Sequence, residues 1–231
     1  MYVPSLYRTE DRTWPVRILE ENPLALLSTS RASAAPYATH VPVIIPRDSR
    51  AELLAGQDPR GAVLLGHMNR ANPHWAALSS GSPAQLVFQG PGAYVSPAVY
   101  DTDPAAPTWD FAAVHVHGTL RLIDDDTETL EVVTATAAEL EGRFGGGWCA
   151  HASAAYFEEL LPGVGAFAFR VTRMDTMLKL SQEKSPGVRS AVTEWFRAGG
   201  GRGAEMARLM KDFYQDGAPR GEGPAEPPTD P

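Results

Sequence analysis

The chain has 231 residues, of which 43% are hydrophobic and 21% are charged, a composition typical of soluble globular domains. Its 28 acidic residues outnumber its 20 Lys and Arg residues, and no stretch is basic enough to displace counterions from nucleic-acid phosphates. The single cysteine excludes an internal disulfide and every metal site that needs several thiolates. The apolar runs are too short to cross a bilayer, and the N-terminus lacks the basic and apolar segments of a secretory signal. We therefore expect a cytoplasmic protein that binds neither nucleic acid directly nor membranes.

The N-terminal half of the chain predicts mainly short strands. Asp11 is a suitable N-cap for a helix that runs to about Asn22. A second, short helix is expected where Pro73 follows Asn72, because proline favours the first helical position. The other apolar runs are bounded by Gly, Pro, Ser and Asn, as strands are. The strands expected are Leu24–Ser30, Pro36–Ile45, Ala62–Met68, Gln85–Gln89 and Ala93–Ser96, the last two as a hairpin around Gly90-Pro91-Gly92.

The C-terminal half predicts helices and two further strands. A proline-rich, irregular loop is expected over Val99–Thr108. Apolar and polar residues then alternate from Val114 to Ile123, which is the period of a half-buried strand. The remaining elements expected are a helix from Asp124 to about Phe144, a helix at Ala154–Leu161, a strand at Gly165–Val171, helices from Ser185 to about Arg197 and over Ala204–Tyr214, and a disordered tail at Asp216–Pro231.

This order of elements predicts the fold class. Six or seven short strands interrupted by helices favour a mainly β, α+β architecture, an antiparallel β-barrel with peripheral helices. A small barrel fills its interior with its own side chains. A sizeable ligand is therefore expected outside the barrel, in a groove completed by a second subunit.

Polar residues are densest between Gly66 and Trp75, where a strand ends and a helix begins. A helix N-terminus with Arg70 can bind an anionic group such as a phosphate or a propionate. The imidazoles of His67 and His74 suit iron, zinc or copper. The ordinary alternative is that His74 packs in the core and that Arg70 forms a surface ion pair.

A second group of candidates follows in the Pro-rich region. Tyr94, Tyr100 and Trp109 can line a pocket with amphipathic rings, or they can simply hold the loop together. Lys179 lies between two leucines near a strand end, where it could neutralise a cofactor carboxylate or phosphate, or extend its ammonium to the surface.

His115 and His117 share one strand face and could bind a metal, but the sequence offers no third ligand at a suitable spacing. The motifs of serine hydrolases, P-loop NTPases, zincins and Rossmann dehydrogenases are all missing from the sequence.

Several segments together resemble the PaiB-type "FMN-binding negative transcriptional regulator" family. They are Met1–Pro4, Ala38–Pro42, Gly66–Trp75, Phe88–Ser96, Pro107–Trp109 and Lys179–Gln182. The resemblance implies a homodimeric split β-barrel with a cofactor groove between subunits. Residues 1–182 would form this cofactor-binding domain, helices in 183–215 would pack on it, and 216–231 would be the tail. The family places Arg70, Asn72, Trp75 and Lys179 near the cofactor.

A narrower resemblance is to the haem-dependent piperazate synthases, which share that fold. It rests on His67–Leu78, Ala93–Tyr100 and Leu161–Phe167. An imidazole at position 74, where PaiB-type members more often carry glutamine, favours haem b over FMN as the cofactor. Either His67 or His74 would then be the axial ligand of the haem iron.

The narrower resemblance implies a lyase-type cyclisation of L-N5-hydroxyornithine to L-piperazic acid, with N–N bond formation and loss of water. Tyr94, Tyr100, Trp109 and Asp110 would supply pocket walls and polar contacts to that substrate. Two alternatives remain at this point, a PaiB-like flavin-binding regulator and a haem-degrading oxygenase on a related split barrel.

Overall fold

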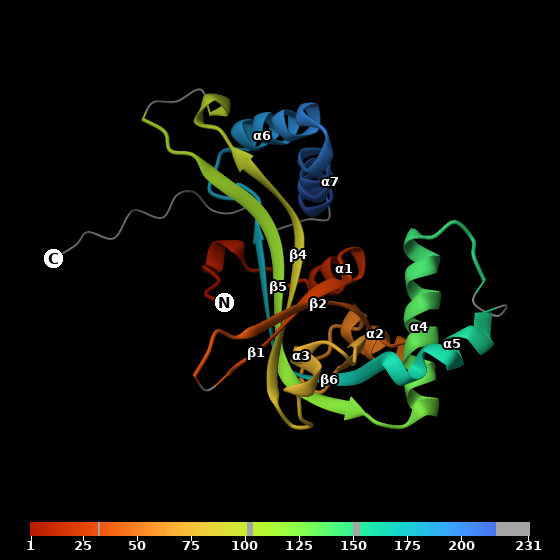
Figure 1. Ribbon diagram of the computed structural model, residues 1–231. Helices are drawn as coiled ribbons and strands as arrows, with labels where there is room; N and C mark the ends of the chain where they lie inside the picture. Colours follow the sequence, from red (N-terminus) through yellow and green to blue (C-terminus); the bar gives the residue numbers. More distant parts are fainter. Residues whose placement is uncertain (32, 101–103, 150–152, 216–231) are drawn as a thin grey trace. The chain divides into compact units, whose positions relative to one another are not determined.

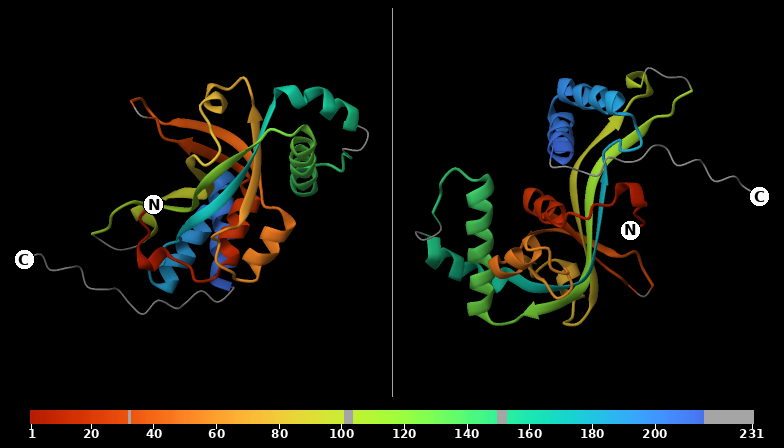
Figure 2. Two further views of the ribbon diagram at one scale, coloured as in Figure 1. Left: turned by 90° about the horizontal axis from the view of Figure 1, so that it is seen from below. Right: turned by 180° about the vertical axis from the view of Figure 1, so that it is seen from behind.

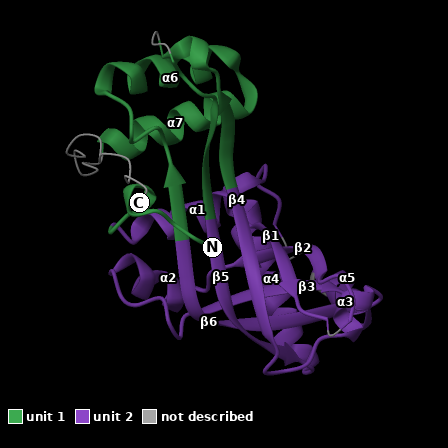
Figure 3. Cartoon of the chain, turned by 90° about the vertical axis from the view of Figure 1, so that its left-hand side faces the viewer, with its two compact units in different colours: residues 1–10, 90–113, 176–231 green, residues 11–89, 114–175 purple. Residues whose placement is uncertain are grey.

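The computed structural model describes residues 1–31, 33–100, 104–149 and 153–215, and Figures 1 and 2 trace the chain from three sides. The chain falls into two compact units, which are coloured separately in Figure 3. Unit 1 comprises Met1–Glu10, Gly90–Ala113 and Thr176–Pro231, and unit 2 comprises Asp11–Gln89 and Val114–Asp175. The predicted tail at Asp216–Pro231 lies outside the described residues. The division into a domain at 1–182 and helices at 183–215 stays a prediction.

Six strands close an antiparallel barrel in the order β1-β2-β3-β6-β5-β4, which confirms the predicted fold class. The strands are β1 (Leu24–Thr29), β2 (Tyr37–Ile44), β3 (Val63–Asn69), β4 (Pro83–Val95), β5 (Thr108–Ile123) and β6 (Val164–Lys179). Unit 2 contains the first three strands entirely, and the other three pass through the boundary between the units.

Alternation along the strands explains how unit 2 fills its part of the barrel. In β3, Leu64, Gly66 and Met68 are buried while the residues between them are less so, because successive side chains point to opposite faces. A Cβ on Gly66 would lie 2.5 Å from the ring of Phe167 on the paired strand β6. The glycine therefore makes room for a large aromatic side chain in the core.

One strand prediction is wrong, and two others give strands that are too short. The expected hairpin around Gly90-Pro91-Gly92 is one continuous strand, β4, and neither glycine has the positive φ of a tight turn. Strands β5 and β6 are also longer than their predicted cores at Val114–Ile123 and Gly165–Val171. Proline and glycine are usual turn residues, but an extended backbone accepts both where no ladder hydrogen bond is needed.

Within its described residues, unit 2 has five helices. They are α1 (Thr13–Glu21), α2 (Arg47–Leu54), α3 (Pro73–Ala76), α4 (Asp126–Phe144) and α5 (Ala154–Leu160). The sequence did not predict α2, which buries only Ser49 and Leu53 and so has little apolar periodicity. Helix α4 packs over β2 and β3, and α5 lies beside it (Figures 1 and 2).

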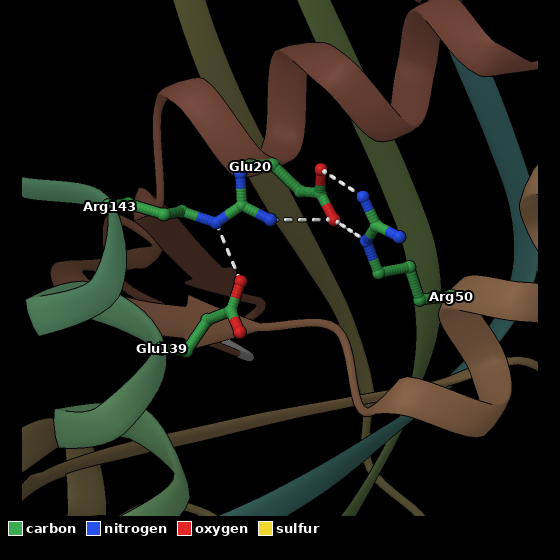
Figure 4. A network of polar contacts seen from close by, with 4 residues as sticks. All are labelled: Glu20, Arg50, Glu139 and Arg143. Carbon is green, nitrogen blue, oxygen red and sulfur yellow. Dashed lines mark hydrogen bonds and ion pairs between the residues drawn. The ribbon is translucent and has the colours of Figure 1, made fainter.

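A network of ion pairs links three of these helices (Figure 4). Glu20 on α1 accepts hydrogen bonds from Arg50 on α2 and is 3.0 Å from Arg143 on α4. Arg143 also pairs with Glu139 at 2.6 Å. The Glu20 side chain is only 11% exposed, so water screens these charges less than it screens surface pairs.

Unit 1 contains the 3₁₀ turns η1 (Ser5–Tyr7) and η2 (Pro97–Val99) and the helices α6 (Pro186–Gly199) and α7 (Gly201–Gln215). The two helices pack on each other, and Phe196 and Met206 are among the residues that they bury. Gly200 has a φ of 66°, which lets the chain turn sharply between them. Among the residues described, no helix is long and apolar enough to span a membrane.

Candidate functional site

His74 is the most firmly held of the predicted site residues in unit 2. Asn72 caps α3 by accepting a hydrogen bond from the His74 backbone N–H at 2.9 Å. The ring is fully buried and stacks on Tyr37 with 4.8 Å between centroids. Its Nε2 lies 2.8 Å from the Thr29 hydroxyl and its Nδ1 lies 2.9 Å from the Thr39 hydroxyl. Both ring nitrogens are therefore engaged, and burial lowers the pKa of His74, so the ring is neutral at pH 7.

His67 differs from His74 in its hydrogen bonding. It lies on β3 opposite Ala166 of β6, and its ring is partly buried. Its Nδ1 is buried and has no hydrogen-bond partner. Burial also lowers the pKa of His67. The side chain is thus a neutral imidazole whose nitrogens are not used by the described part of the fold.

Arg70 and Trp75 lie against the start of β6. The Arg70 Nε donates to the Val164 carbonyl at 2.7 Å, and its guanidinium lies 5.6 Å from the centroid of the Trp75 ring. A Cβ on Gly165 would come within 2.5 Å of that ring. One donor of Arg70 therefore holds the β6 backbone, while no described residue engages its two terminal nitrogens.

Asp110 is the centre of a buried polar cluster in unit 1. The Ser181 hydroxyl donates to Asp110 Oδ2 at 2.6 Å, whereas Oδ1 is buried without a partner. Burial raises the pKa of Asp110 to about 6. The Ser181 hydrogen bond opposes this shift, the Glu183 carboxylate adds to it, and the Lys179 ammonium opposes it. This carboxyl therefore changes its charge close to neutral pH, which is a property of functional acids and bases.

Lys179 and Tyr100 are further predicted site residues in unit 1. The Lys179 ammonium donates to the Thr108 hydroxyl, and it also lies 5.9 Å from the centroid of the Tyr7 ring. The Tyr100 hydroxyl is buried without a partner, and burial raises the pKa of Tyr100, with a further contribution from the Asp110 charge. Lys184 lies 4.2 Å from the centroid of the Tyr100 ring.

Tyr94 and Trp109 form an exposed aromatic pair in unit 1. Their ring centroids are 6.1 Å apart, and 50% of Tyr94 and 54% of Trp109 is exposed. Trp109 and Asp110 are neighbours on one strand, so they point to opposite faces. The structure thus separates the four predicted substrate contacts into two buried and two exposed side chains.

His115 and His117 do share a strand face, but other side chains engage them. The Gln85 amide lies 3.2 Å from His115 Nδ1 and 3.3 Å from His117 Nε2. His117 Nε2 is also 3.0 Å from Arg173 and 3.4 Å from Asp175. In the described part of the chain, no three His, Cys, Asp or Glu side chains converge as metal ligands do.

Sequence reasoning missed the partners of the candidate residues. Thr29 and Thr39 hold His74 from β1 and β2, and Ser181 holds Asp110 from the turn after β6. Ser181 carried a weak signal, because it lies in the Lys179–Gln182 segment that supports the family resemblance. The threonines carried no such signal, because both lie far in sequence from the helix that they contact.

The chain is similar to proteins of one family over most of its length. A family model described as "Putative FMN-binding domain" matches residues 1–173. "Protease synthase and sporulation protein PAI 2" of Bacillus subtilis is 25% identical over 92% of this chain and 97% of its own. Protein YKL070W of Saccharomyces cerevisiae is 28% identical over 61% of this chain and 90% of its own.

A solved structure shares the fold. The FAD and haem binding protein of Mycobacterium smegmatis superposes with a TM-score of 0.52 at 17% identity, over 84% of this chain and 80% of that chain.

Proposed function

This chain belongs to the family described as "Putative FMN-binding domain", and we propose that it is a cofactor-binding split-barrel protein. We further propose that its cofactor is haem b and that it cyclises L-N5-hydroxyornithine to L-piperazic acid. The family and the shared fold with a protein named for binding FAD and haem support the class of cofactor. The stretches His67–Leu78 and Ala93–Tyr100, which resemble the piperazate synthases, support the reaction. A homodimer that takes an N-hydroxylated amino acid as its substrate is part of this proposal.

The state of His67 is the observation that carries the choice of haem. Iron binds the neutral form of imidazole, and burial keeps His67 in that form. Its Nδ1 has no competing partner, whereas both nitrogens of His74 are engaged by threonine hydroxyls. We therefore propose that His67 would hold the haem iron and that His74 has a structural role. A flavin has no comparable need for an imidazole.

Residues beside His67 in the sequence suit the charged edge of such a cofactor. The two terminal nitrogens of Arg70 remain available for a carboxylate, and a guanidinium binds carboxylates with two parallel hydrogen bonds. The half-buried Trp75 ring and the Asn72 cap fix the segment from which Arg70 extends. Lys179, in unit 1, enters the proposal from the family resemblance alone. The same groups could bind the phosphate of FMN, which is the alternative cofactor.

The proposed reaction joins the α-amine nitrogen to N5 and breaks the bond between N5 and its hydroxyl oxygen. The hydroxyl leaves with one hydrogen of the amine as water, so no external oxidant or reductant is needed. A bound ferric haem supplies a Lewis acid that weakens the N–O bond.

The protein must also accept a proton, because the α-amine attacks only when it is neutral. With a pKa of about 6, Asp110 is mostly ionised at pH 7 and can hold that proton at its unpartnered Oδ1.

A titration of the purified full chain with hemin tests the cofactor assignment. We expect a Soret band in the wild type, its loss in His67→Ala, and an unchanged band in His40→Ala, a matched change at an exposed histidine on β2. Added imidazole should restore the band in His67→Gly, because the free base can replace the missing side chain.

Two outcomes would overturn this assignment. An unchanged Soret band in His67→Ala would refute His67 as the ligand. A protein that binds FMN and gives no Soret band with hemin would favour a PaiB-like flavin-binding regulator instead.

A further inference from the structure

The turn that follows β6 contains an unusual backbone conformation. Ser181 has a φ of 59° and is the only residue other than glycine with a positive φ in the described ranges. It is also fully buried. A left-handed conformation costs free energy for any residue with a Cβ, so it persists only where the surrounding structure enforces it.

Three hydrogen bonds enforce the conformation of Ser181. The Leu180 backbone N–H donates to the Gln182 side chain at 2.6 Å, and the Gln182 amide donates back to the Leu178 carbonyl. The Tyr214 hydroxyl on α7 donates to the Leu180 carbonyl at 2.7 Å. Both neighbours of Ser181 are thus fixed, and the turn cannot relax without breaking these bonds.

The enforced conformation directs the Ser181 hydroxyl to Asp110. The Ser181 Oγ lies 2.6 Å from Asp110 Oδ2, although the two residues are 71 positions apart. The other carboxyl oxygen, Oδ1, is buried and has no partner. The hydrogen bond to Oδ2 thus occupies one oxygen of the ionised carboxylate and leaves Oδ1 free to accept a proton.

From this geometry we infer that Ser181 is a positioning residue for Asp110, which it orients so that Oδ1 is left free to accept the proton of the reaction. The hydroxyl of Ser181 stabilises the ionised carboxylate, because it donates a hydrogen bond to it. The inference rests on the proposed function in one respect, the role of Asp110 as the proton acceptor. Its physical basis, the coupling between Ser181 and the charge of Asp110, does not depend on the identity of the substrate.

Other charged groups of unit 1 also act on Asp110. The Glu183 carboxylate raises its pKa and the Lys179 ammonium lowers it. Besides burial, the Asp110 charge in turn raises the pKa of three tyrosines, which are Tyr7, Tyr100 and Tyr214. None of these groups changes when the Ser181 hydroxyl is removed, so the effect of that change can be isolated.

Two substitutions separate the hydroxyl from the backbone. Ser181→Ala removes the hydroxyl and keeps the strained conformation, whereas Ser181→Gly removes the hydroxyl and relieves the strain. Ser190→Ala, at an exposed position on α6, is the matched control. The Asp110 titration would be followed by the carboxyl carbon signal in NMR spectra of the full chain without cofactor.

We expect the titration midpoint of Asp110 to move to higher pH by the same amount in Ser181→Ala and Ser181→Gly, and to stay in place in Ser190→Ala. Ser181→Gly should unfold at a higher urea concentration than Ser181→Ala. In the active protein, the acid limb of the kcat/KM profile should move in the same direction as the midpoint.

The inference is refuted if the Asp110 midpoint is the same in all four proteins, or if it moves only in the less stable variant. Failure of the proposed function gives a different result. In that case the midpoint still moves in both Ser181 variants, while the wild type forms no product from N5-hydroxyornithine.

Discussion

The buried carboxyl of Asp110 gives the stability of the protein a specific pH dependence. The pKa of this group is raised by burial from 3.8 to about 6. Between these values the folded protein binds more protons than the unfolded chain, so stability must fall as the pH rises from about 4 to about 6. An asparagine at this position fits the same space and can still accept the Ser181 hydrogen bond, but it cannot ionise.

The magnitude follows from the two pKa values. The difference between 3.8 and about 6 corresponds to roughly 3 kcal/mol of unfolding free energy. At about pH 4 the Asp110→Asn variant and the wild type should be almost equally stable, because the wild-type carboxyl is protonated when folded. At about pH 7.5 the variant should be more stable by up to roughly 3 kcal/mol.

Urea unfolding of both proteins over this pH range measures the difference directly. Groups that titrate independently of Asp110 contribute equally to both proteins, so subtracting the two free energies isolates the ionisation of Asp110 together with its coupling to Glu183. A difference that does not change with pH would show that Asp110 has an ordinary pKa. A variant that loses stability relative to the wild type as the pH rises would refute the sign of the argument.

Three further predictions test the packing of unit 2. Gly165→Ala should lower the unfolding free energy by about 1–3 kcal/mol, because the new Cβ would clash with the Trp75 ring; an unchanged urea midpoint would contradict this. Glu20→Gln should cost roughly 1–3 kcal/mol, since it removes the shared carboxylate of the ion-pair network. Because that carboxylate is only 11% exposed, most of the loss should persist in high salt; an unchanged urea midpoint would show that the network contributes nothing to stability. Thr29→Val should lower the unfolding free energy by about 1–3 kcal/mol, because it leaves His74 Nε2 buried without a partner. Thermal unfolding measures this loss, and equal melting temperatures would mean that the hydrogen bond contributes nothing.

Local patterns predicted the framework of the fold. The pair Asn72-Pro73 specifies the start of α3, and the structure has both the cap and the helix there. The alternation over Val114–Ile123 identified a strand, because burial of one face leaves its period in the sequence. It did not show that β5 begins at Thr108, because three adjacent residues, Ala112–Val114, are all buried and interrupt the alternation between the two parts of the strand.

The states of the candidate residues could not be predicted in the same way, because they depend on contacts between distant positions. His67 and His74 are equally suited to bind iron by residue type. Only the threonine hydroxyls, 45 and 35 positions from His74, distinguish the engaged ring from the free one. Similarly, nothing local to Asp110 indicates that a serine with a positive φ donates a hydrogen bond to it.

The formation of the nitrogen–nitrogen bond is the central claim, and labelled substrate tests it most directly. The full chain would be loaded with hemin and incubated with L-N5-hydroxyornithine that carries ¹⁵N at both nitrogens. The proposed function predicts a product that is lighter by one water and whose NMR spectrum shows a one-bond coupling between the two ¹⁵N nuclei. Unchanged substrate, or a dehydrated product without that coupling, would contradict it.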